Sequence, residues 1–181
     1  MNTSTYTLEK TAYTIDNIAE QRARNIKKIF NPRNVIELCC GKSLNILKKH
    51  YQKQGIKIYG NDIDEKYLEI NPELVIGDCL KIKHNKFEVC VFAPPLSKGC
   101  SGKREDALSI EEVEPSYYDF INLNLDKFLL VLAGKTFSIR KDRNQYYKLL
   151  NYLDSKGYIV EIIPLKYKKI NKYIDLYVRK K

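Results

Sequence analysis

The sequence contains no tryptophan, a single methionine and only two histidines. No apolar run approaches the roughly 20 residues that a membrane-spanning helix requires. Residues 1–9 also lack the charged-then-apolar pattern of a secretory signal. From these absences we expect a cytoplasmic protein with no membrane partner.

The spacing of the cysteines does not suggest a metal site. The five cysteines are Cys39, Cys40, Cys79, Cys90 and Cys100, and no two of them form a C-x-x-C pair. The two histidines, His50 and His84, have no metal-ligand spacing either. We therefore expect reduced and mostly buried thiols, surface histidines and no metal.

Positive charge is what the sequence has in excess. Its 181 residues include 32 Lys and Arg against 22 Asp and Glu, a formal net charge of +10. Such an excess favours anionic partners, most simply nucleic acid, although a lysine-rich solvated surface is the alternative. The length suits one well-buried domain over residues 1–181.

Short apolar runs alternate with amphipathic segments along the chain. A polar arm is expected over 1–13, followed by a helix from Thr14 to Phe30 and a core from 34 to 181. The runs at 35–40, 57–61, 74–76, 87–92, 127–133, 158–163 and 173–178 predict seven strands. Helices are predicted between the earlier strands, with Pro115 dividing the helix of 110–125 into two pieces. The link between the last two runs is too short for a crossover helix, so that pair is predicted to be antiparallel. The pattern predicts one three-layer α/β domain with a mostly parallel sheet.

Three of the predicted strands end in residues that could hold a ligand. The first runs into Glu37-Leu-Cys-Cys-Gly41-Lys-Ser43, where Gly41 would let a ligand lie against the backbone. The second is followed by Asp62, whose planar carboxylate offers two acceptor oxygens, and the third is followed by Gly77-Asp78-Cys79. Tight turns at strand ends and helix capping by Asp64 are the structural alternatives.

Together with the final strand pair, these motifs resemble class I S-adenosylmethionine-dependent methyltransferases from Val35 to Val178. The resemblance implies a Rossmann-like sandwich, S-adenosylmethionine as cofactor and S-adenosylhomocysteine as product. It also implies cofactor-binding roles for seven residues: Glu37 toward the methionine ammonium, Cys39 and Gly41 in the loop, Asp62 on the ribose, Ile63 against the adenine, and Asp78 and Cys79 reading the adenine edge. Cys39 and Ser43 stand where the family usually has glycines.

The fourth strand is followed by Ala93-Pro94-Pro95-Leu96, where amine methyltransferases often carry Asn/Asp-Pro-Pro-aromatic. Ala93 has no side-chain acceptor for a target amine, and Leu96 has no aromatic face for a flipped base. Ala93, Pro94 and Pro95 are the candidate catalytic residues, as the turn that shapes the acceptor pocket. Cys100, just beyond, is either a packing residue or a nucleophile.

Basic residues follow the fourth and fifth strands, on the side where ligands bind in such folds. The candidate substrate-binding residues are Lys98, Lys103, Arg104 and Arg140. They favour an anionic substrate, RNA more than DNA, although ordinary solvated loops would look the same. A protein or small-molecule methyltransferase and a non-catalytic binding protein are the alternatives. A partner subunit or homodimer could supply substrate recognition, because no separate recognition domain is evident.

Overall fold

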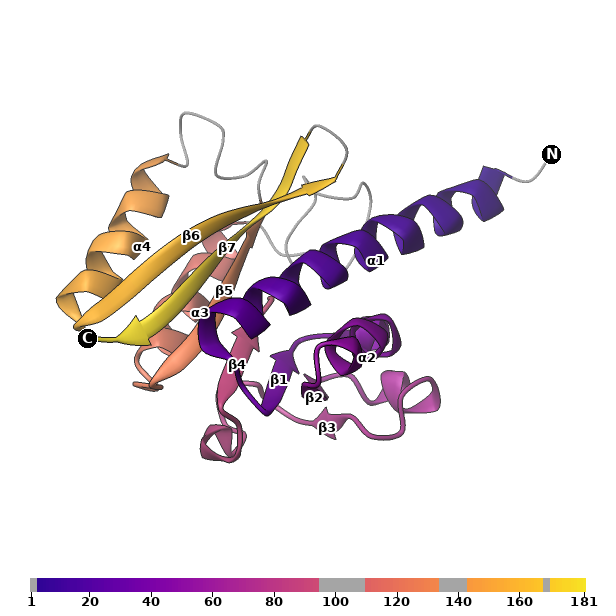
Figure 1. Ribbon diagram of the computed structural model, residues 1–181, viewed down its shortest axis with the longest axis horizontal. Coiled ribbons are helices and arrows are strands. Elements are labelled where there is room, and N and C mark those ends of the chain that lie inside the picture. Colours follow the sequence, from indigo (N-terminus) through magenta and orange to yellow (C-terminus); the bar gives the residue numbers. More distant parts are fainter. Residues whose placement is uncertain (1–2, 95–109, 134–142, 168–169) are drawn as a thin grey trace.

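A single twisted sheet with helices on both faces forms the protein (Figure 1). The structure, a computed structural model, describes residues 3–94, 110–133, 143–167 and 170–181. The strands are β1 (Asn34–Leu38), β2 (Lys57–Asp62), β3 (Val75–Ile76), β4 (Val89–Phe92), β5 (Lys127–Ala133), β6 (Tyr158–Tyr167) and β7 (Ile170–Lys180). The helices are α1 (Thr3–Phe30), α2 (Leu44–Lys53), α3 (Ile110–Ile121) and α4 (Arg143–Ser155), with 3-10 turns at Gly41–Ser43, Glu65–Glu69 and His84–Lys86.

The strand order is β3-β2-β1-β4-β5-β7-β6. The first five strands run parallel, and β7 lies antiparallel between β5 and β6. This arrangement confirms the predicted fold class, including the antiparallel carboxyl-terminal pair. Because β1 lies near the middle of the order, its carboxyl end is flanked on both sides by parallel neighbours.

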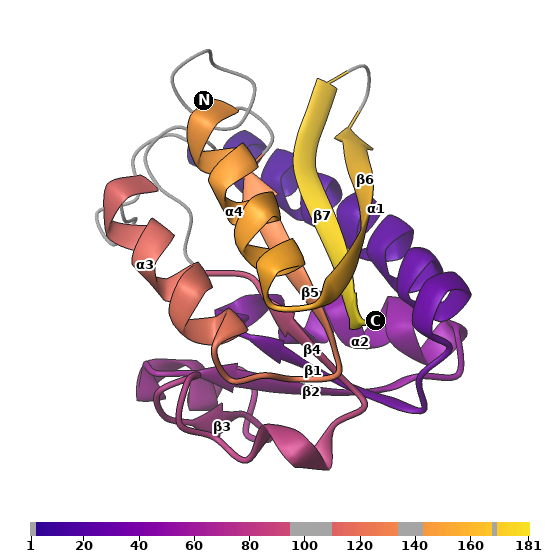
Figure 2. The same ribbon diagram turned by 90° about the vertical axis from the view of Figure 1, so that its left-hand side faces the viewer.

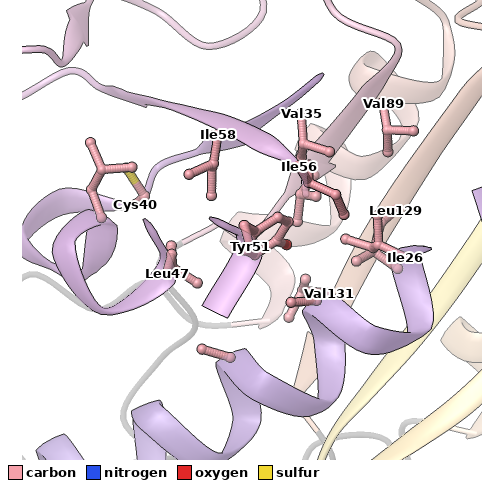
Figure 3. Packing of buried hydrophobic residues seen from close by; sticks show 14 of the residues in the cluster. Ile26, Val35, Cys40, Leu47, Tyr51, Ile56, Ile58, Val89, Leu129 and Val131 are labelled. Carbon is pink, nitrogen blue, oxygen red and sulfur yellow. The ribbon is translucent and has the colours of Figure 1, made fainter. Parts of the chain in front are cut away.

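Successive side chains of the central strands point to opposite faces of the sheet, and this divides the core into two layers. Val35 packs with residues of α1 and α2, whereas Ile36 packs with residues of α3 and α4. Figure 2 shows these two pairs of helices on opposite sides of the sheet. Figure 3 shows the first layer, in which helix residues interlock with the strands. Its labelled residues are Ile26, Val35, Cys40, Leu47, Tyr51, Ile56, Ile58, Val89, Leu129 and Val131. A strand covered on both faces must be apolar almost throughout, which explains the near-continuous run of β1.

The amino-terminal helix is longer than predicted. It begins at Thr3, so the polar arm expected over residues 1–13 is wrong for residues 3–13. Once Ile18, Ala23 and Ile26 hold the helix against the sheet, each further turn adds hydrogen bonds at little cost in nucleation. Figure 1 shows this part of α1 projecting beyond the sheet.

Two other predictions are also wrong. Pro115 does not divide α3, which runs unbroken through it; the proline is exposed, while Tyr117 and Phe120 hold the helix on the sheet. His50 and His84 are buried rather than at the surface. Each has a polar partner, since His50 Nε2 lies 2.7 Å from Asp16 Oδ1 and His84 Nε2 lies 2.7 Å from the Cys79 carbonyl oxygen.

Candidate functional site

The loops singled out in the sequence begin at one edge of the sheet. In the register of the strands, Leu38 of β1 pairs with Asn61 of β2, and Asp62 pairs with Ile76 of β3. The segments that follow, 39–43, 63–64 and 77–79, therefore leave the sheet side by side. Residues up to 40 positions apart in the chain are brought together at the carboxyl ends of parallel strands, where open α/β sheets bind ligands.

The Asp62 carboxylate is held at this edge by backbone donors. Gly41 N donates to Asp62 Oδ2 at 2.8 Å, and Asp64 N donates to Oδ1 at 3.1 Å. Cys40 N also donates to the Asn61 carbonyl oxygen at 3.0 Å, which ties the loop to β2. Each carboxylate oxygen can accept two hydrogen bonds, so these contacts leave acceptor capacity on Asp62.

The backbone conformation at residue 41 and the space around it both favour glycine. Its φ of +49° is in the left-handed region, and a Cβ there would lie 3.2 Å from the Tyr67 ring and 3.5 Å from Asp62 Oδ2. A Cβ at residue 41 would crowd the Tyr67 ring, while its distance from the carboxylate would be an ordinary van der Waals contact. Gly41 is buried, so the absence of a side chain lets the Tyr67 ring pack closely against the loop where it meets Asp62.

Two asparagines that the sequence analysis missed tie the three loops together. Asn61 Nδ2 donates to the carbonyl oxygens of Val75 and Gly77 at 2.8 and 3.0 Å. Asn71 Nδ2 donates to the Gly41 carbonyl oxygen at 3.3 Å, and Gly77 N donates to the Asp62 carbonyl oxygen at 3.0 Å. The signal available in the sequence was Asn61 itself, a polar residue at the end of an apolar strand.

Ile63 follows Asp62 and is the most exposed large apolar residue of the described chain, at 73%. An aliphatic side chain left in water beside a buried carboxylate is available to pack against a flat apolar ligand surface. The loop after β3 lies next to it through the pairing of Asp62 with Ile76. Exposed Ile63 therefore provides an apolar contact surface next to a hydrogen-bonding group.

Asp78 and Cys79 form the third loop. The Asp78 carboxylate accepts from Leu80 N at 3.0 Å and pairs with Lys81 at 3.2 Å, and these contacts lower its pKa. A hydrogen bond with the Cys79 thiol, together with burial, raises the pKa of the Cys39 thiol well above its ordinary value. Cys39 is thus a neutral thiol, held at a φ of +58° that is unusual for a residue other than glycine.

Glu37 lies deeper than the other candidate residues and is only 3% exposed. Its Oε1 lies 3.4 Å from Arg22 Nη1, and the Tyr51 hydroxyl donates to its Oε2 at 3.4 Å. Burial, reinforced by the nearby Asp175 charge and opposed by Arg22, raises the pKa of Glu37 to about 7. The sequence analysis missed Arg22 and Asp175, although an aspartate inside the apolar run of β7 was a usable signal.

Ala93 and Pro94 follow β4 at the same edge, since Phe92 pairs with Leu38. Ala93 is half-buried and Pro94 is buried. The other candidates of this part of the site lie outside the described residues: Pro95, Lys98, Cys100, Lys103, Arg104 and Arg140. The three loops after β1, β2 and β3 therefore lie within the described residues, whereas the acceptor side is described only at its start.

Within the described ranges, three or more His, Cys, Asp or Glu side chains nowhere gather as metal ligands would. In the same part of the chain, no helix combines the length and apolar character needed to span a membrane.

Comparison with known proteins assigns the architecture. No protein-family model and no curated protein sequence matches the chain, but many solved structures do. The fold is that of the class I S-adenosylmethionine-dependent methyltransferases. Three of these structures are 11 to 14% identical to this chain, and at such identities the likeness concerns the fold alone.

The methyltransferase domain of bacterial CtHen1 superposes with a TM-score of 0.60 at 11% identity, covering 92% of this chain and 100% of that one. Magnesium protoporphyrin IX methyltransferase from Synechocystis PCC 6803, solved with bound S-adenosylmethionine, gives 0.58 at 14% identity, covering 94% and 80%. The plantazolicin methyltransferase BpumL, in complex with S-adenosylhomocysteine, gives 0.61 at 12% identity, covering 98% and 88%.

Proposed function

We propose that this protein is an S-adenosylmethionine-dependent methyltransferase. The observation that carries the proposal is the Asp62 carboxylate, which Gly41 N and Asp64 N hold beside the exposed Ile63. A carboxylate with spare acceptors beside an apolar surface fits an adenosine, which presents two ribose hydroxyls next to a flat ring. The similar structures solved with S-adenosylmethionine or S-adenosylhomocysteine support the same cofactor.

The roles proposed for the remaining residues follow their places along this edge. Asp78 and the Cys79 backbone would read the adenine edge, Cys39 and Gly41 would lie under the cofactor, and Glu37 would provide negative charge for the methionine ammonium. When bound, the cofactor supplies a methyl group already activated on a sulfonium. The chain then needs to position the reactants and exclude water more than to supply an acid or a base.

For the substrate we propose RNA, or another anionic molecule, on the strength of the net charge of +10. Lys98, Lys103, Arg104 and Arg140 are the proposed substrate contacts, and the turn Ala93-Pro94-Pro95 the proposed wall of the acceptor pocket. The absence of a side-chain acceptor at Ala93 favours the second candidate, a protein or small-molecule substrate. The similar structures named above include methyltransferases named for a porphyrin and for plantazolicin. A partner subunit or a homodimer remains part of the proposal for substrate recognition.

The cofactor is tested by calorimetry with S-adenosylmethionine on the wild type, Asp62→Ala and Glu88→Ala. Asp62→Ala should weaken binding about 100-fold or more, because two charge-assisted hydrogen bonds to the ribose are lost. Glu88 is a matched control, since its carboxylate also accepts from a backbone N–H, that of Arg33 at 3.0 Å, but at the opposite end of the strands. Thermal unfolding checks that both variants fold.

Undetectable binding to the wild type at millimolar cofactor would overturn the proposal. Transfer of labelled methyl from the cofactor to total RNA, compared with transfer to protein in the same lysate, separates the two substrate classes. A non-catalytic protein would retain partner binding in Asp62→Ala and transfer no label to either.

A further inference from the structure

A cluster of buried charges lies beneath α1, away from the loops described above. It joins Arg22 of α1, Glu37 of β1 and Asp175 of β7, whose side chains are all at least 94% buried. The cluster spans three elements that are distant in sequence, because Arg22 and Asp175 are 153 positions apart. Only Glu37 belongs to the proposed cofactor site.

The guanidinium is shared unequally between the two carboxylates. Arg22 Nε and Nη2 donate to Asp175 Oδ2 and Oδ1 at 2.7 and 3.0 Å, a bidentate pair. Its remaining contact, from Nη1 to Glu37 Oε1, is longer at 3.4 Å. Asp175 therefore takes most of the compensating charge, and Glu37 takes the lesser part.

If both carboxylates were ionised, one guanidinium would face two negative charges in a dry interior. An uncompensated buried charge is costly, and a carboxyl group in that position avoids the cost by keeping its proton. The other titratable groups nearby do not compensate this excess of negative charge. The Tyr51 hydroxyl of α2 donates to Glu37, Tyr177 lies beside Asp175 on β7, and the Cys40 thiol is neutral because burial raises its pKa to about 12.

We propose that Asp175 is a positioning residue that occupies the Arg22 guanidinium and so keeps Glu37 protonated in the empty site, and that binding of the methyl donor drives this proton into solvent. The inference rests on the proposed function. The ammonium of the bound cofactor would supply the positive charge that the cluster lacks, so ionised Glu37 becomes the favoured form. Cofactor binding and deprotonation are then coupled reciprocally. The raised pKa of Glu37, about 7, places this coupling near neutral pH.

The experiment is calorimetric titration with S-adenosylmethionine between pH 6 and pH 8, in two buffers of different ionisation enthalpy. Their difference in apparent enthalpy counts the protons released on binding. We expect nearly one proton per cofactor at pH 6 and almost none at pH 8. For one coupled proton with a midpoint near pH 7, the affinity should rise about tenfold over this range.

Variants identify the group that releases the proton. Glu37→Gln should release none and bind with an affinity that does not change with pH, which also excludes His50 and His84 as the source. Asp175→Asn should move the release to lower pH, because Arg22 is then free to stabilise ionised Glu37. Glu88→Gln, a change at an exposed carboxylate, should behave as the wild type.

If Asp175→Asn does not fold, Tyr51→Phe serves in its place and should move the release to higher pH, since the hydroxyl donates to the ionised carboxylate. A merely structural cluster would alter stability and leave the pH range of proton release unchanged. Binding without proton release, or unchanged release in Glu37→Gln, overturns this inference and leaves the proposed function intact. No binding at any pH overturns both.

Discussion

Two polar regions that meet on β1 hold their charges in different ways. The first region is the rim, formed by residues 39–43, 62–64 and 77–79 at the carboxyl ends of the parallel strands. There the Asp62 carboxylate is fixed by the backbone N–H groups of Gly41 and Asp64, which carry no formal charge. Beneath α1, Glu37 and Asp175 depend on the side chain of one arginine. The rim is built from residues close to the strand ends, whereas the buried cluster requires three distant elements to be in place. In the proposed site, the rim would bind the cofactor and the buried cluster would couple that binding to the proton of Glu37.

The largest expected effect comes from removing the arginine. Arg22→Met would leave Asp175 buried without its partner, and we expect a loss of about 3 to 5 kcal/mol in the free energy of unfolding. The control is Arg24→Met on the exposed side of the same helix, where the ion pair with Glu20 contributes at most about 0.5 kcal/mol. Denaturant unfolding measures both. Equal losses in the two variants would contradict the view that the buried cluster holds α1 on the sheet.

The second-largest effect is expected in the pH dependence of stability, which reports on Glu37 of the buried cluster. The pKa of Glu37 is raised from 4.5 to about 7 on folding, so its stabilising contribution is complete below pH 4.5 and is lost as the pH rises through 7. From this group alone, stability should fall by up to about 3 kcal/mol between pH 4.5 and pH 8. In Glu37→Gln this fall should be absent. Urea unfolding at four pH values tests it, and a fall of the same size in the variant would assign the effect to another group.

A smaller effect is expected from crowding beneath the rim. A Cβ on Gly60 would lie 2.7 Å from Cys40 Sγ and 2.8 Å from methyl carbons of Leu44 and Leu74. Gly60→Ala should therefore cost about 1 to 3 kcal/mol, the usual cost of overpacking. Gly55→Ala is the comparison, because its Cβ would meet nothing within 4 Å and only its φ of +68° is unfavourable, at about 1 kcal/mol. Thermal unfolding that ranks Gly55→Ala as the more damaging change would show that the packing beneath the rim can adjust.

The smallest effect on stability is expected at the exposed end of the rim. Ile63→Ser should change the free energy of unfolding by less than about 0.5 kcal/mol, since the side chain is already in water. It should nevertheless weaken S-adenosylmethionine binding about fivefold, the loss of roughly 1 kcal/mol of apolar contact with the adenine. Unchanged affinity would remove Ile63 from the proposed site without affecting Asp62.

Much of the architecture could be predicted from the chain alone. The run of β5, 127–133, was predicted with the bounds that it has, because a strand buried on both faces has a continuous apolar signal. The antiparallel final pair followed from the short link between its strands. The histidines were misplaced for the opposite reason: a single polar residue gives no sign of which side chain will meet it. Asp16, the partner of His50, lies 34 positions away.

The same distinction, between local patterns and contacts with distant residues, applies to the candidate site. The alternation of strands and helices, and the residues that stand at the strand ends, can be read from the sequence, because periodicity and turn residues are local properties. The partners of Asp62 and Glu37 cannot, since they depend on strand register and on where α1 crosses the sheet. Arg22 appears in the sequence as one basic residue among 32, and it becomes distinctive only when folding buries it between Glu37 and Asp175.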